Sequence, residues 1–377
     1  MTRVALLNDS FISKVLERTL ARLEIPTCVP IPLNPRIPRL SAQAASRLLG
    51  GKAPLLLYTN AEDCLPLVME SASHQLTRPI RALKDKVRMR RLLQGIEPDI
   101  YFREVPKEAL KTFSPPPGKR LVLKPALGFL SLGVRRITND WEQKVEEAQR
   151  ELRDAEGMFP DFVLSGDRFL VEEYIEGEEY ACDGYFDQAG EPVILSISHH
   201  LFEGEEDMRD LVYVSDAAML RTLAPRVEAM LRALASRLGI CRFPFHLEFR
   251  LRQDRLQVVE LNPMRFGGFG LADLGAFAFG IDSYACFFEQ KKPDVSGMLP
   301  DDGSCYAFVL GRVPPGARGR APDHEAFRGT FGHILDYRPL DHRRYPCFCR
   351  VLAKGEAPED FRKYLTMDFS RYFGKTG

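Results

Sequence analysis

The sequence predicts an α/β protein, on the basis of three observations. First, apolar strands and helical segments alternate over residues 1–78, which is typical of a small doubly wound sheet. Second, residues 245–251 and 256–261 form two adjacent strands, joined by a turn at Gln253-Asp254, that carry acidic side chains. Third, 377 residues are enough for two or three domains with hydrophobic cores of their own.

The N-terminal residues are expected to form the doubly wound sheet. The third of its strands is a continuous apolar run, of the kind that is buried inside a parallel sheet. Ser10 precedes the first helix and is expected to cap it. The expected strands cover residues 4–7, 27–31 and 54–59, and the expected helices cover residues 11–23 and 41–49.

Two polar segments follow strands of this region. Residues 8–10 follow the first strand, and residues 59–63 follow the third. Because ligands bind at the carboxyl ends of parallel strands, these segments are expected at the edge of a cleft. Helix capping is an alternative role for the same residue types.

The strands at residues 245–251 and 256–261 bring acidic side chains together. Strand alternation places Glu248 on one face of the first strand, and Glu260 and Asn262 on one face of the second. Two carboxylates and an amide then converge, and hard oxygen ligands of this kind suit Mg²⁺ that is bound to substrate phosphates. Each carboxylate taken alone is equally compatible with a solvated strand surface.

Upstream segments supply the other parts of a nucleotide site. A short apolar strand at residues 121–123 leads into Lys124, and a loop with two glycines follows. A lysine and backbone N–H groups placed in this way can bind phosphates. Another strand, residues 169–171, leads into the acidic segment 172–179, whose backbone and carboxylates can hold adenine and ribose. Each signal alone is weak, but their order and spacing favour a nucleotide site.

With these motifs the chain resembles the ATP-grasp superfamily over roughly residues 80–285, and it is most similar to the carboxylate–amine ligase branch. The resemblance implies that two lysines contact the phosphates of ATP and that the strand-to-hinge segment holds adenine. It also implies that two acidic residues and an asparagine bind Mg²⁺ or Mn²⁺. The residues that carry the resemblance are Lys86, Lys124, Gly128, Ser131, Gly133, Glu172, Glu173, Tyr174, Ile175 and Glu178 at the nucleotide, and Glu248, Glu260 and Asn262 at the metal.

The resemblance also divides the chain into three units. It implies an ATP-grasp fold in which residues 1–80 form a doubly wound pre-ATP-grasp domain. Residues 81–292 would form the nucleotide-binding domain, with two lobes and a hinge near residues 172–176. Residues 293–377 are left as a small C-terminal α/β extension, whose role the residues do not indicate.

The remaining elements are expected from hydrophobic periodicity and from turn residues. Gly239 is the expected end of the helix before it. His199 and His200 follow a strand and are more simply structural than catalytic. The expected helices cover residues 81–93, 105–113, 141–156, 225–238, 269–288 and 358–369, and the expected strands cover residues 180–186, 192–198, 304–310, 332–336 and 347–352.

A candidate substrate anchor follows the metal residues. The family pattern has an arginine and glycines after asparagine and proline, whereas this chain has Met264 inserted before Arg265. We expect Arg265 to hold a substrate carboxylate and Lys124 to stabilise the transferring phosphate, so these two are the expected catalytic residues. An ion pair between Arg265 and Glu248 or Glu260 is the alternative.

The predicted function is an ATP-dependent carboxylate–amine ligase. Such an enzyme would form an amide or peptide bond through an acyl phosphate and release ADP and phosphate. Its substrates besides ATP would be a small carboxylate and a small amine. A kinase that phosphorylates a small acceptor, and a nucleotide sensor without turnover, are the alternatives.

Composition narrows the classes of partner. The 52 lysines and arginines equal the 52 aspartates and glutamates, which disfavours nonspecific nucleic-acid binding. No apolar run reaches the ~18 residues of a membrane span, and no apolar signal segment precedes the first strand. Eight scattered cysteines are typical of reduced thiols. We therefore expect a cytoplasmic enzyme with neither a nucleic-acid nor a membrane partner, and a homodimer is left open.

Overall fold

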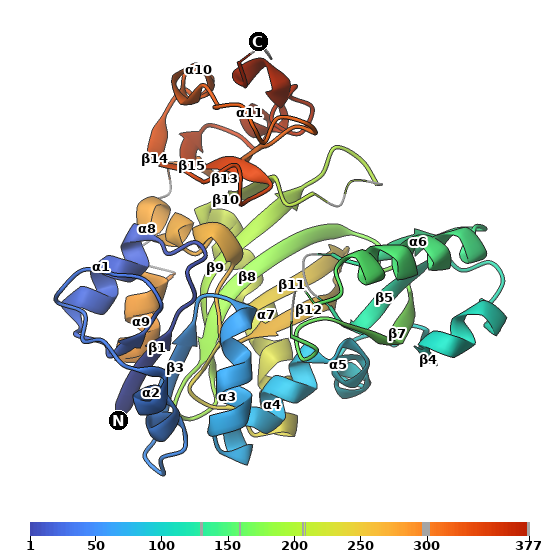
Figure 1. The fold of residues 1–377 in the computed structure, drawn as a ribbon, viewed down its shortest axis with the longest axis horizontal. Coiled ribbons are helices and arrows are strands. Elements are labelled where there is room, and N and C mark those ends of the chain that lie inside the picture. The colour runs from blue at the N-terminus through green and yellow to red at the C-terminus, as the bar shows by residue number, and fades with distance from the viewer. Residues whose placement is uncertain (129–130, 158–159, 206, 208, 296–301, 375–377) are drawn as a thin grey trace.

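The computed structural model describes residues 1–128, 131–157, 160–205, 207, 209–295 and 302–374. These residues form three sheets with helices packed around them, so the predicted α/β class is confirmed. Figure 1 shows the three-stranded sheet with its helices on one side of the large central sheet. The four-stranded sheet lies on the opposite side, and the C-terminal strands lie above both.

The N-terminal sheet is parallel, as predicted. β1 (Thr2–Leu6) lies between β2 (Thr27–Cys28) and β3 (Leu55–Thr59) and pairs in parallel with both strands. The buried side chains of β1 and β3 are hydrophobic except for that of Thr59, which explains the continuous hydrophobic run in the third strand. The other elements of this region are α1 (Lys14–Arg22), α2 (Ala42–Leu49), the 3₁₀ helix η1 (Glu62–Cys64) and α3 (Leu65–Ser71).

The cap of α1 differs from the prediction. The Ser13 hydroxyl accepts a hydrogen bond from the Leu16 N–H at 3.0 Å, so Ser13 rather than Ser10 caps the helix. The backbone N–H of Ser10 instead donates to Asn8 Oδ1 at 3.0 Å. Residues 8–10 therefore form a side-chain-stabilised turn at the carboxyl end of β1.

The prediction of one helix over residues 81–93 is wrong, because the chain breaks at Asp85. The Asp85 side chain accepts hydrogen bonds from the N–H groups of Val87 and Arg88, at 3.0 and 3.1 Å, and its backbone is extended. Two helices result, α4 (His74–Lys84) and α5 (Lys86–Leu93). The break places one lysine at the end of a helix and the other at the start of the next.

The four-stranded sheet forms a small lobe that is antiparallel throughout, in the order β4-β7-β5-β6. Helix α6 (Trp141–Asp154) packs on it and shares its hydrophobic core. The helix predicted over residues 105–113 is wrong at its first two residues, which belong to a strand. Val105 pairs there with Phe169 of the neighbouring strand. The strands are β4 (Phe102–Pro106), β5 (Leu121–Leu127), β6 (Arg135–Ile137) and β7 (Ser165–Glu173), and the 3₁₀ helix η2 (Lys107–Thr112) follows β4.

The large sheet has eight antiparallel strands in the order β12-β11-β8-β9-β10-β13-β15-β14. Both predicted hairpins, β8–β9 and β11–β12, are present. The long helix α7 (Ala217–Leu238) packs against β9 and ends at Gly239, whose φ of 64° supplies the predicted stop. The central strands are β8 (Glu178–Phe186), β9 (Pro192–Leu201), β10 (Val212–Ser215), β11 (Phe243–Arg252) and β12 (Arg255–Pro263).

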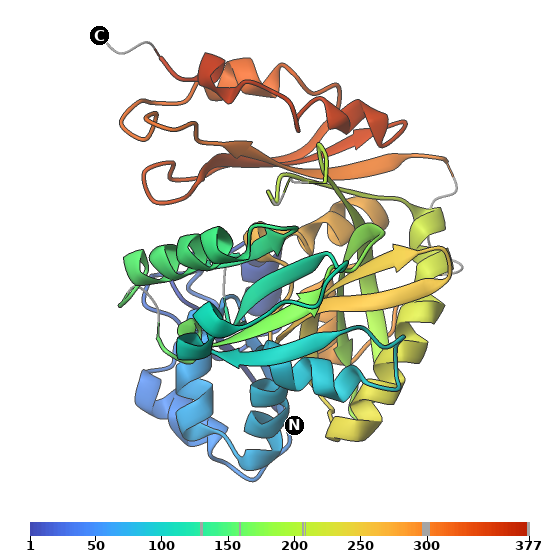
Figure 2. The same ribbon diagram turned by 90° about the vertical axis from the view of Figure 1, so that its right-hand side faces the viewer.

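The C-terminal strands extend this same sheet beyond β10, and Figure 2 shows them as a layer along one end of the molecule. The three predicted C-terminal strands are confirmed. The predicted terminal helix over residues 358–369 is wrong, since only a short helix and a 3₁₀ turn form there. The elements are β13 (Cys305–Arg312), α10 (His324–Arg328), β14 (Ile334–Pro339), β15 (Cys347–Gly355), α11 (Glu359–Arg362) and η4 (Phe369–Tyr372).

The predicted single helix over residues 269–288 is two short helices, α8 (Asp273–Phe279) and α9 (Ser283–Glu289). Gly280, at a φ of 70°, ends the first, and the Asp282 side chain caps the second by accepting from the Ala285 N–H at 3.0 Å. Within the described residues no one helix has both the length and the apolar character to cross a membrane. The bent pair Gly268–Phe279 and Ser283–Glu289 meets those criteria only jointly, with an angle of 91° between its halves.

Among the described residues, the small lobe has a hydrophobic core that is distinct from the main core. The main core runs continuously from the N-terminal sheet through the large sheet to the C-terminal strands. A separate core lies between the four-stranded sheet and α6. The chain passes from one to the other between β7 and β8, at the predicted hinge. The division into three units stays a prediction.

Candidate active site

The β11–β12 hairpin places the two predicted metal carboxylates side by side. Glu248 of β11 lies directly opposite Glu260 of β12, and His246 lies opposite Asn262. A bulge between Glu248 and Phe249 interrupts the ladder here, as bulges often do beside functional sites. The structure thus brings Glu248, Glu260 and Asn262 together on one face of the sheet.

The pKa values of the two carboxylates are shifted in opposite directions. Burial works against ionisation of Glu260, but Lys86 and Lys84 outweigh it and lower the pKa of Glu260 to about 2. Lys86 Nζ lies 2.7 Å from Glu260 Oε1. Burial raises the pKa of Glu248, and the neighbouring charge of Glu260 adds to that shift. A cation shared by the two carboxylates would relieve their repulsion.

The donor set fits a hard divalent cation. Glu248, Glu260 and Asn262 offer the oxygen atoms that Mg²⁺ and Mn²⁺ prefer. Across the part of the chain that the structure describes, no three His, Cys, Asp or Glu side chains are grouped for metal binding. Two carboxylates and an amide would leave coordination positions for water and for phosphate oxygens.

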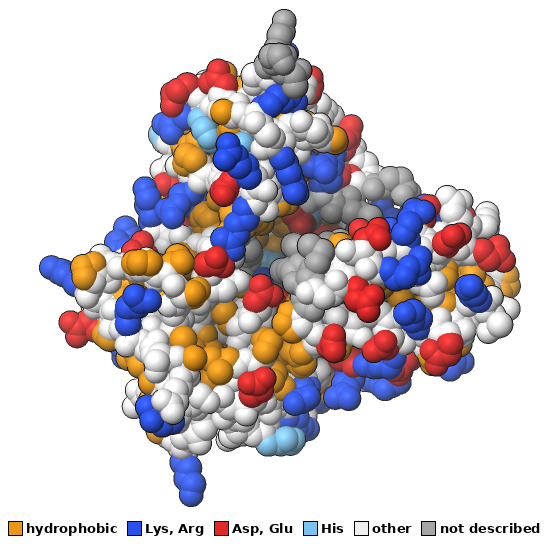
Figure 3. Space-filling model, viewed as in Figure 1, with side chains coloured by type: hydrophobic (Ala, Val, Ile, Leu, Met, Phe, Trp, Pro, Cys, Tyr) orange, Lys and Arg blue, Asp and Glu red, His pale blue; other side chains and the backbone are white. Residues whose placement is uncertain are grey.

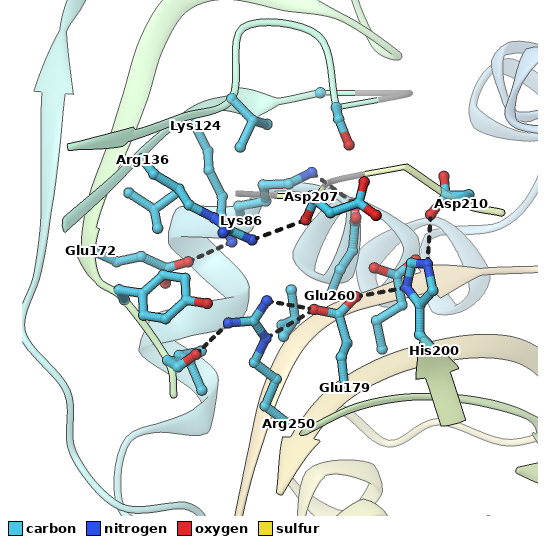
Figure 4. A pocket seen from close by; sticks show the side chains of 18 of the residues that line it. Lys86, Lys124, Arg136, Glu172, Glu179, His200, Asp207, Asp210, Arg250 and Glu260 are labelled. Atoms are coloured by element: carbon cyan, nitrogen blue, oxygen red, sulfur yellow. Dashed lines mark hydrogen bonds and ion pairs between the residues drawn. The ribbon is translucent and has the colours of Figure 1, made fainter. Parts of the chain in front are cut away.

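A pocket opens between the small lobe and the large sheet, and Figure 4 shows it from close by. Lys86 reaches it from the first residue of α5, and Lys124 reaches it from β5. Glu248 and Glu260 line the same pocket. The two predicted phosphate lysines and the two predicted metal carboxylates therefore face one space.

Glu172 is a buried residue in the lining of this pocket, and its carboxylate pairs with two cations. Its carboxylate lies 2.7 Å from Lys124 Nζ and 2.9 Å from Arg90 Nε. Burial disfavours the charge, yet Arg90 and Lys124 outweigh it and lower the pKa of Glu172. Arg90 also donates to the Val258 carbonyl at 2.9 Å, so it ties the end of β7 to β12. Glu172 therefore fixes Lys124 and the hinge.

The predicted phosphate loop begins at Gly128, which lines the pocket. A Cβ at this position would lie 3.2 Å from the Pro125 ring and 3.6 Å from Lys86 Nζ, so glycine leaves room beside that lysine. Ser131 also lines the pocket, with a φ of 56°, and Gly133 has a φ of 72°. Residues 129 and 130 of the loop lie outside the described residues.

Only some residues of the hinge line the pocket. Tyr174 and Ile175 line it, whereas Glu173 and Glu178 do not. Glu173 instead pairs with Lys119 at 2.6 Å, and Glu178 accepts from the Tyr180 hydroxyl at 2.9 Å. Of the predicted hinge contacts, the structure thus places the two carboxylates Glu173 and Glu178 outside the pocket.

Gly177 shows why the chain can turn at the hinge. Its φ is 119°, and a Cβ there would lie 2.4 Å from the Leu251 carbonyl oxygen of β11. Any other residue at this position would collide with the sheet backbone. The hinge is therefore held close against β11.

Two cationic residues of the pocket, His200 and Arg250, were not assigned to the site from the sequence, and both contact Glu179 of the acidic segment. Glu179 is bound by His200 at 3.2 Å and by Arg250 at 2.9 Å, and these partners outweigh its burial and lower its pKa to about 2. Arg250 also donates to the Ile175 carbonyl at 2.6 Å. Strand alternation could have identified Arg250, because it shares a face with Glu248, and Glu179 lies directly opposite Arg250 on the neighbouring strand.

Arg265 lies in a different cluster from the one expected. Its Nη2 is 3.2 Å from Glu62 Oε1, and the alternative pairing with Glu248 or Glu260 is not found. Met264, the inserted residue, has a φ of 66°, and its carbonyl accepts from the Thr59 N–H at 2.8 Å. Arg265 is absent from the lining of the pocket between the lobes.

A buried brace links the loop at Arg265 to the metal carboxylates. Asp183 Oδ1 accepts from His246 Nδ1 and from the Gly267 N–H, each at 2.8 Å. His246 Nε2 lies 3.6 Å from Glu248 Oε1. Burial disfavours the imidazolium, but Asp183 and Glu248 outweigh it and raise the pKa of His246 to about 9. Asp183 and His246 thus connect the loop at Arg265 to the metal carboxylate Glu248.

Comparison with known proteins agrees with this geometry. The ATP-grasp domain family matches residues 118–273, which contain Lys124, the hinge and both metal carboxylates. Residues 118–273 therefore form an ATP-grasp domain. The resemblance inferred from the sequence is confirmed, and so is the predicted ATP-grasp fold. No curated protein matches the chain.

Solved ATP-grasp structures share the fold over nearly the whole chain. An L-amino acid ligase from Bacillus licheniformis matches with a TM-score of 0.72 and 16% identity, over 99% of this chain and 98% of that one. N5-carboxyaminoimidazole ribonucleotide synthetase from Thermotoga maritima matches at 0.64 and 14%, over 99% of each chain. Biotin carboxylase from Campylobacter jejuni matches at 0.61 and 15%, over 93% and 87%.

Proposed function

We propose that this ATP-grasp protein is an ATP-dependent carboxylate–amine ligase. The observation that carries the proposal is the convergence of Lys86, Lys124, Glu248 and Glu260 on the pocket between the lobes. Neighbours of the same fold include an L-amino acid ligase, which supports ligation as the type of reaction. A small carboxylate and a small amine are the proposed substrates, in a cytoplasmic enzyme.

The proposed reaction has two steps. A carboxylate oxygen of the first substrate attacks the γ-phosphorus of ATP, the bond from that phosphorus to the β,γ-bridging oxygen breaks, and ADP leaves. The amine nitrogen of the second substrate then attacks the carbonyl carbon of the acyl phosphate. Phosphate departs with the electron pair of the broken C–O bond, the nitrogen loses a proton, and an amide remains.

The protein contributes positioning and charge in this scheme. Lys86 and Lys124 neutralise phosphate charge, and Glu172 keeps Lys124 in place through an ion pair of 2.7 Å. Glu248, Glu260 and Asn262 would hold Mg²⁺ or Mn²⁺, which when bound screens the charge on the transferring phosphoryl group. The backbone at Tyr174 and Ile175 would hold adenine, with Gly128, Ser131 and Gly133 beside the phosphates.

Arg265 is the proposed anchor of the substrate carboxylate. It lies three residues after Asn262 in a loop held at both ends, by the bonds from Thr59 to Met264 and from Gly267 to Asp183. Its planar guanidinium suits a carboxylate better than an ammonium would. Arg265→Ala should raise the KM for the carboxylate and leave ATP binding intact, and Arg265→Lys should restore little.

An assay of ADP release against panels of carboxylates and amines tests the proposal. Release that requires both a carboxylate and an amine, with an amide detected by mass spectrometry, is the expected result. Phosphorylation of one acceptor without an amine would replace the proposal with a kinase. Magnesium-dependent ATP binding without any turnover would replace it with a nucleotide sensor.

A further inference from the structure

We infer that Glu62 is the positioning residue of the substrate-carboxylate subsite, where it orients Arg265 and connects that arginine to the phosphate loop. The inference rests on the proposed ligase function and deepens it, because it assigns a part of the acceptor site to the N-terminal region. Glu62 belongs to none of the nucleotide or metal motifs.

Glu62 lies in η1, directly beyond the carboxyl end of β3, and is 2% exposed. Ligands of such sheets bind at that edge. Its two carboxylate oxygens hold different cations, with Oε1 at 3.2 Å from Arg265 Nη2 and Oε2 hydrogen-bonded to Lys84 Nζ. A buried carboxylate of this kind persists only when it is paired, and here both oxygens are paired.

The contacts of Arg265 leave one part of its guanidinium unused. Nη1 donates to the Phe266 carbonyl at 3.2 Å, and Nη2 faces Glu62. Nε is buried and has no hydrogen-bond partner among the described residues. A buried donor without an acceptor is costly, and a substrate carboxylate would supply the missing acceptor.

The surroundings leave space for such a substrate. A Cβ at Gly268, three residues after Arg265, would meet no atom within 4 Å. Figure 3 shows the face of the molecule that is seen in Figure 1, which is hollowed near its centre. We place the access to the carboxylate subsite on the open side of Gly268.

The second partner of Glu62 connects the subsite to the nucleotide. Lys84 Nζ also donates to the Gly128 carbonyl at 2.9 Å, at the start of the phosphate loop. Glu62 thus lies between the arginine proposed to hold the carboxylate and the loop proposed to hold the γ-phosphate. Keeping reacting groups aligned in this way is a main source of rate in group transfer.

Glu62→Gln keeps the size of the side chain and removes its charge. The KM for the carboxylate should rise about tenfold or more, with a smaller fall in kcat, because Arg265 loses its fixed orientation. The Kd for Mg–ATP should change by less than about threefold. Glu62→Asp keeps the charge on a shorter side chain and should lie between the two. Glu70→Gln, an exposed carboxylate of α3, is the matched control.

The outcomes separate this inference from the proposed function. If wild type shows turnover that depends on carboxylate and amine, and Glu62→Gln has the carboxylate KM of Glu70→Gln, the inference fails and the ligase stands. If wild type shows no such turnover, the ligase proposal fails. A crystal structure of Glu62→Gln, or of Glu62→Asp if the first does not fold, still tests the positioning role. An Arg265 guanidinium left in place there would overturn it.

Discussion

Two buried charge clusters of this protein use the same kinds of residue to opposite effect. At the cleft, burial disfavours the charge of Glu260, but the positive charges of Lys86 and Lys84 outweigh this effect and lower its pKa to about 2. Where the C-terminal strands meet α8, burial of Asp273 outweighs the single cation Arg350 and raises the pKa of Asp273 to about 6. The number of nearby cations decides between the two outcomes.

The clusters also differ in access. Lys86 and Glu260 line a pocket, and Glu260 is 23% exposed. Asp273 and Arg350 are each 1% exposed, and Arg350 bridges Asp273 at 3.3 Å and Asp336 at 3.0 Å. Cations and carboxylates that line an open pocket can contact a ligand, whereas the charges of a closed cluster can only hold elements of the fold together. We therefore expect mutations at the cleft to change activity, and mutations at the closed cluster to change stability.

The largest expected effect on stability is that of Arg350→Met. The change leaves Asp273 buried without its cation, which should lower the free energy of unfolding by about 3–5 kcal/mol at neutral pH. Chemical denaturation followed by circular dichroism measures this. Arg343→Met, at an exposed position shortly before β15, is the control and should cost less than about 0.5 kcal/mol. Equal stability of the two variants would contradict a structural role for the closed cluster.

Glu260→Gln should give the largest effect on activity. Loss of one proposed metal ligand should reduce ADP release by about 10²–10³-fold, since charge at the transferring phosphate is no longer screened. The Kd for ATP should change by less than about tenfold, because the proposed adenine contacts lie at the hinge. Steady-state kinetics and calorimetry measure the two quantities, with the exposed Glu325→Gln as control. A fully active Glu260→Gln enzyme would show that the metal is held elsewhere.

The pKa of Asp273 predicts a pH dependence of stability. Because the folded value of about 6 exceeds the ordinary value of 3.8, folding takes up a proton between these limits. The resulting stabilisation is complete below pH 3.8 and is lost as the pH rises through 6, by about 3 kcal/mol in total. Asp273→Asn cannot titrate, so the difference in unfolding free energy, wild type minus variant, should fall over this range. A difference independent of pH would show that Asp273 has an ordinary pKa.

Lys124→Met should have the smallest of these effects. Loss of one ammonium should weaken ATP binding by about tenfold, since Lys86 still faces the phosphates. Glu172 keeps Arg90 at 2.9 Å, so the variant should retain its fold. Calorimetric titration with a non-hydrolysable ATP analogue measures the affinity. The control is Lys119→Met, which removes the exposed lysine that pairs with Glu173. Unchanged affinity would place the phosphates away from β5.

Much of the site could be predicted because its signals are local. Strand alternation and a short turn predict the β11–β12 hairpin and place acidic side chains on both of its strands. Regular pairing from that turn would put Val259 opposite Glu248, and the bulge between Glu248 and Phe249 places Glu260 there instead. The break between α4 and α5 was missed, although its cause is local too. Asp85 is a good helix cap, and its two hydrogen bonds within α5 stop the preceding helix.

The sequence by itself determined the α/β class, the order of the nucleotide motifs and the face on which the carboxylates lie. Only the tertiary structure decided the partners of the buried charges. Glu172 meets Arg90, and Arg265 meets Glu62, across 82 and 203 residues of chain. Short-range patterns determine the direction in which a side chain points. The packing of the sheets determines which opposite charge lies next to it, and this packing depends on the burial of apolar surface over the whole chain.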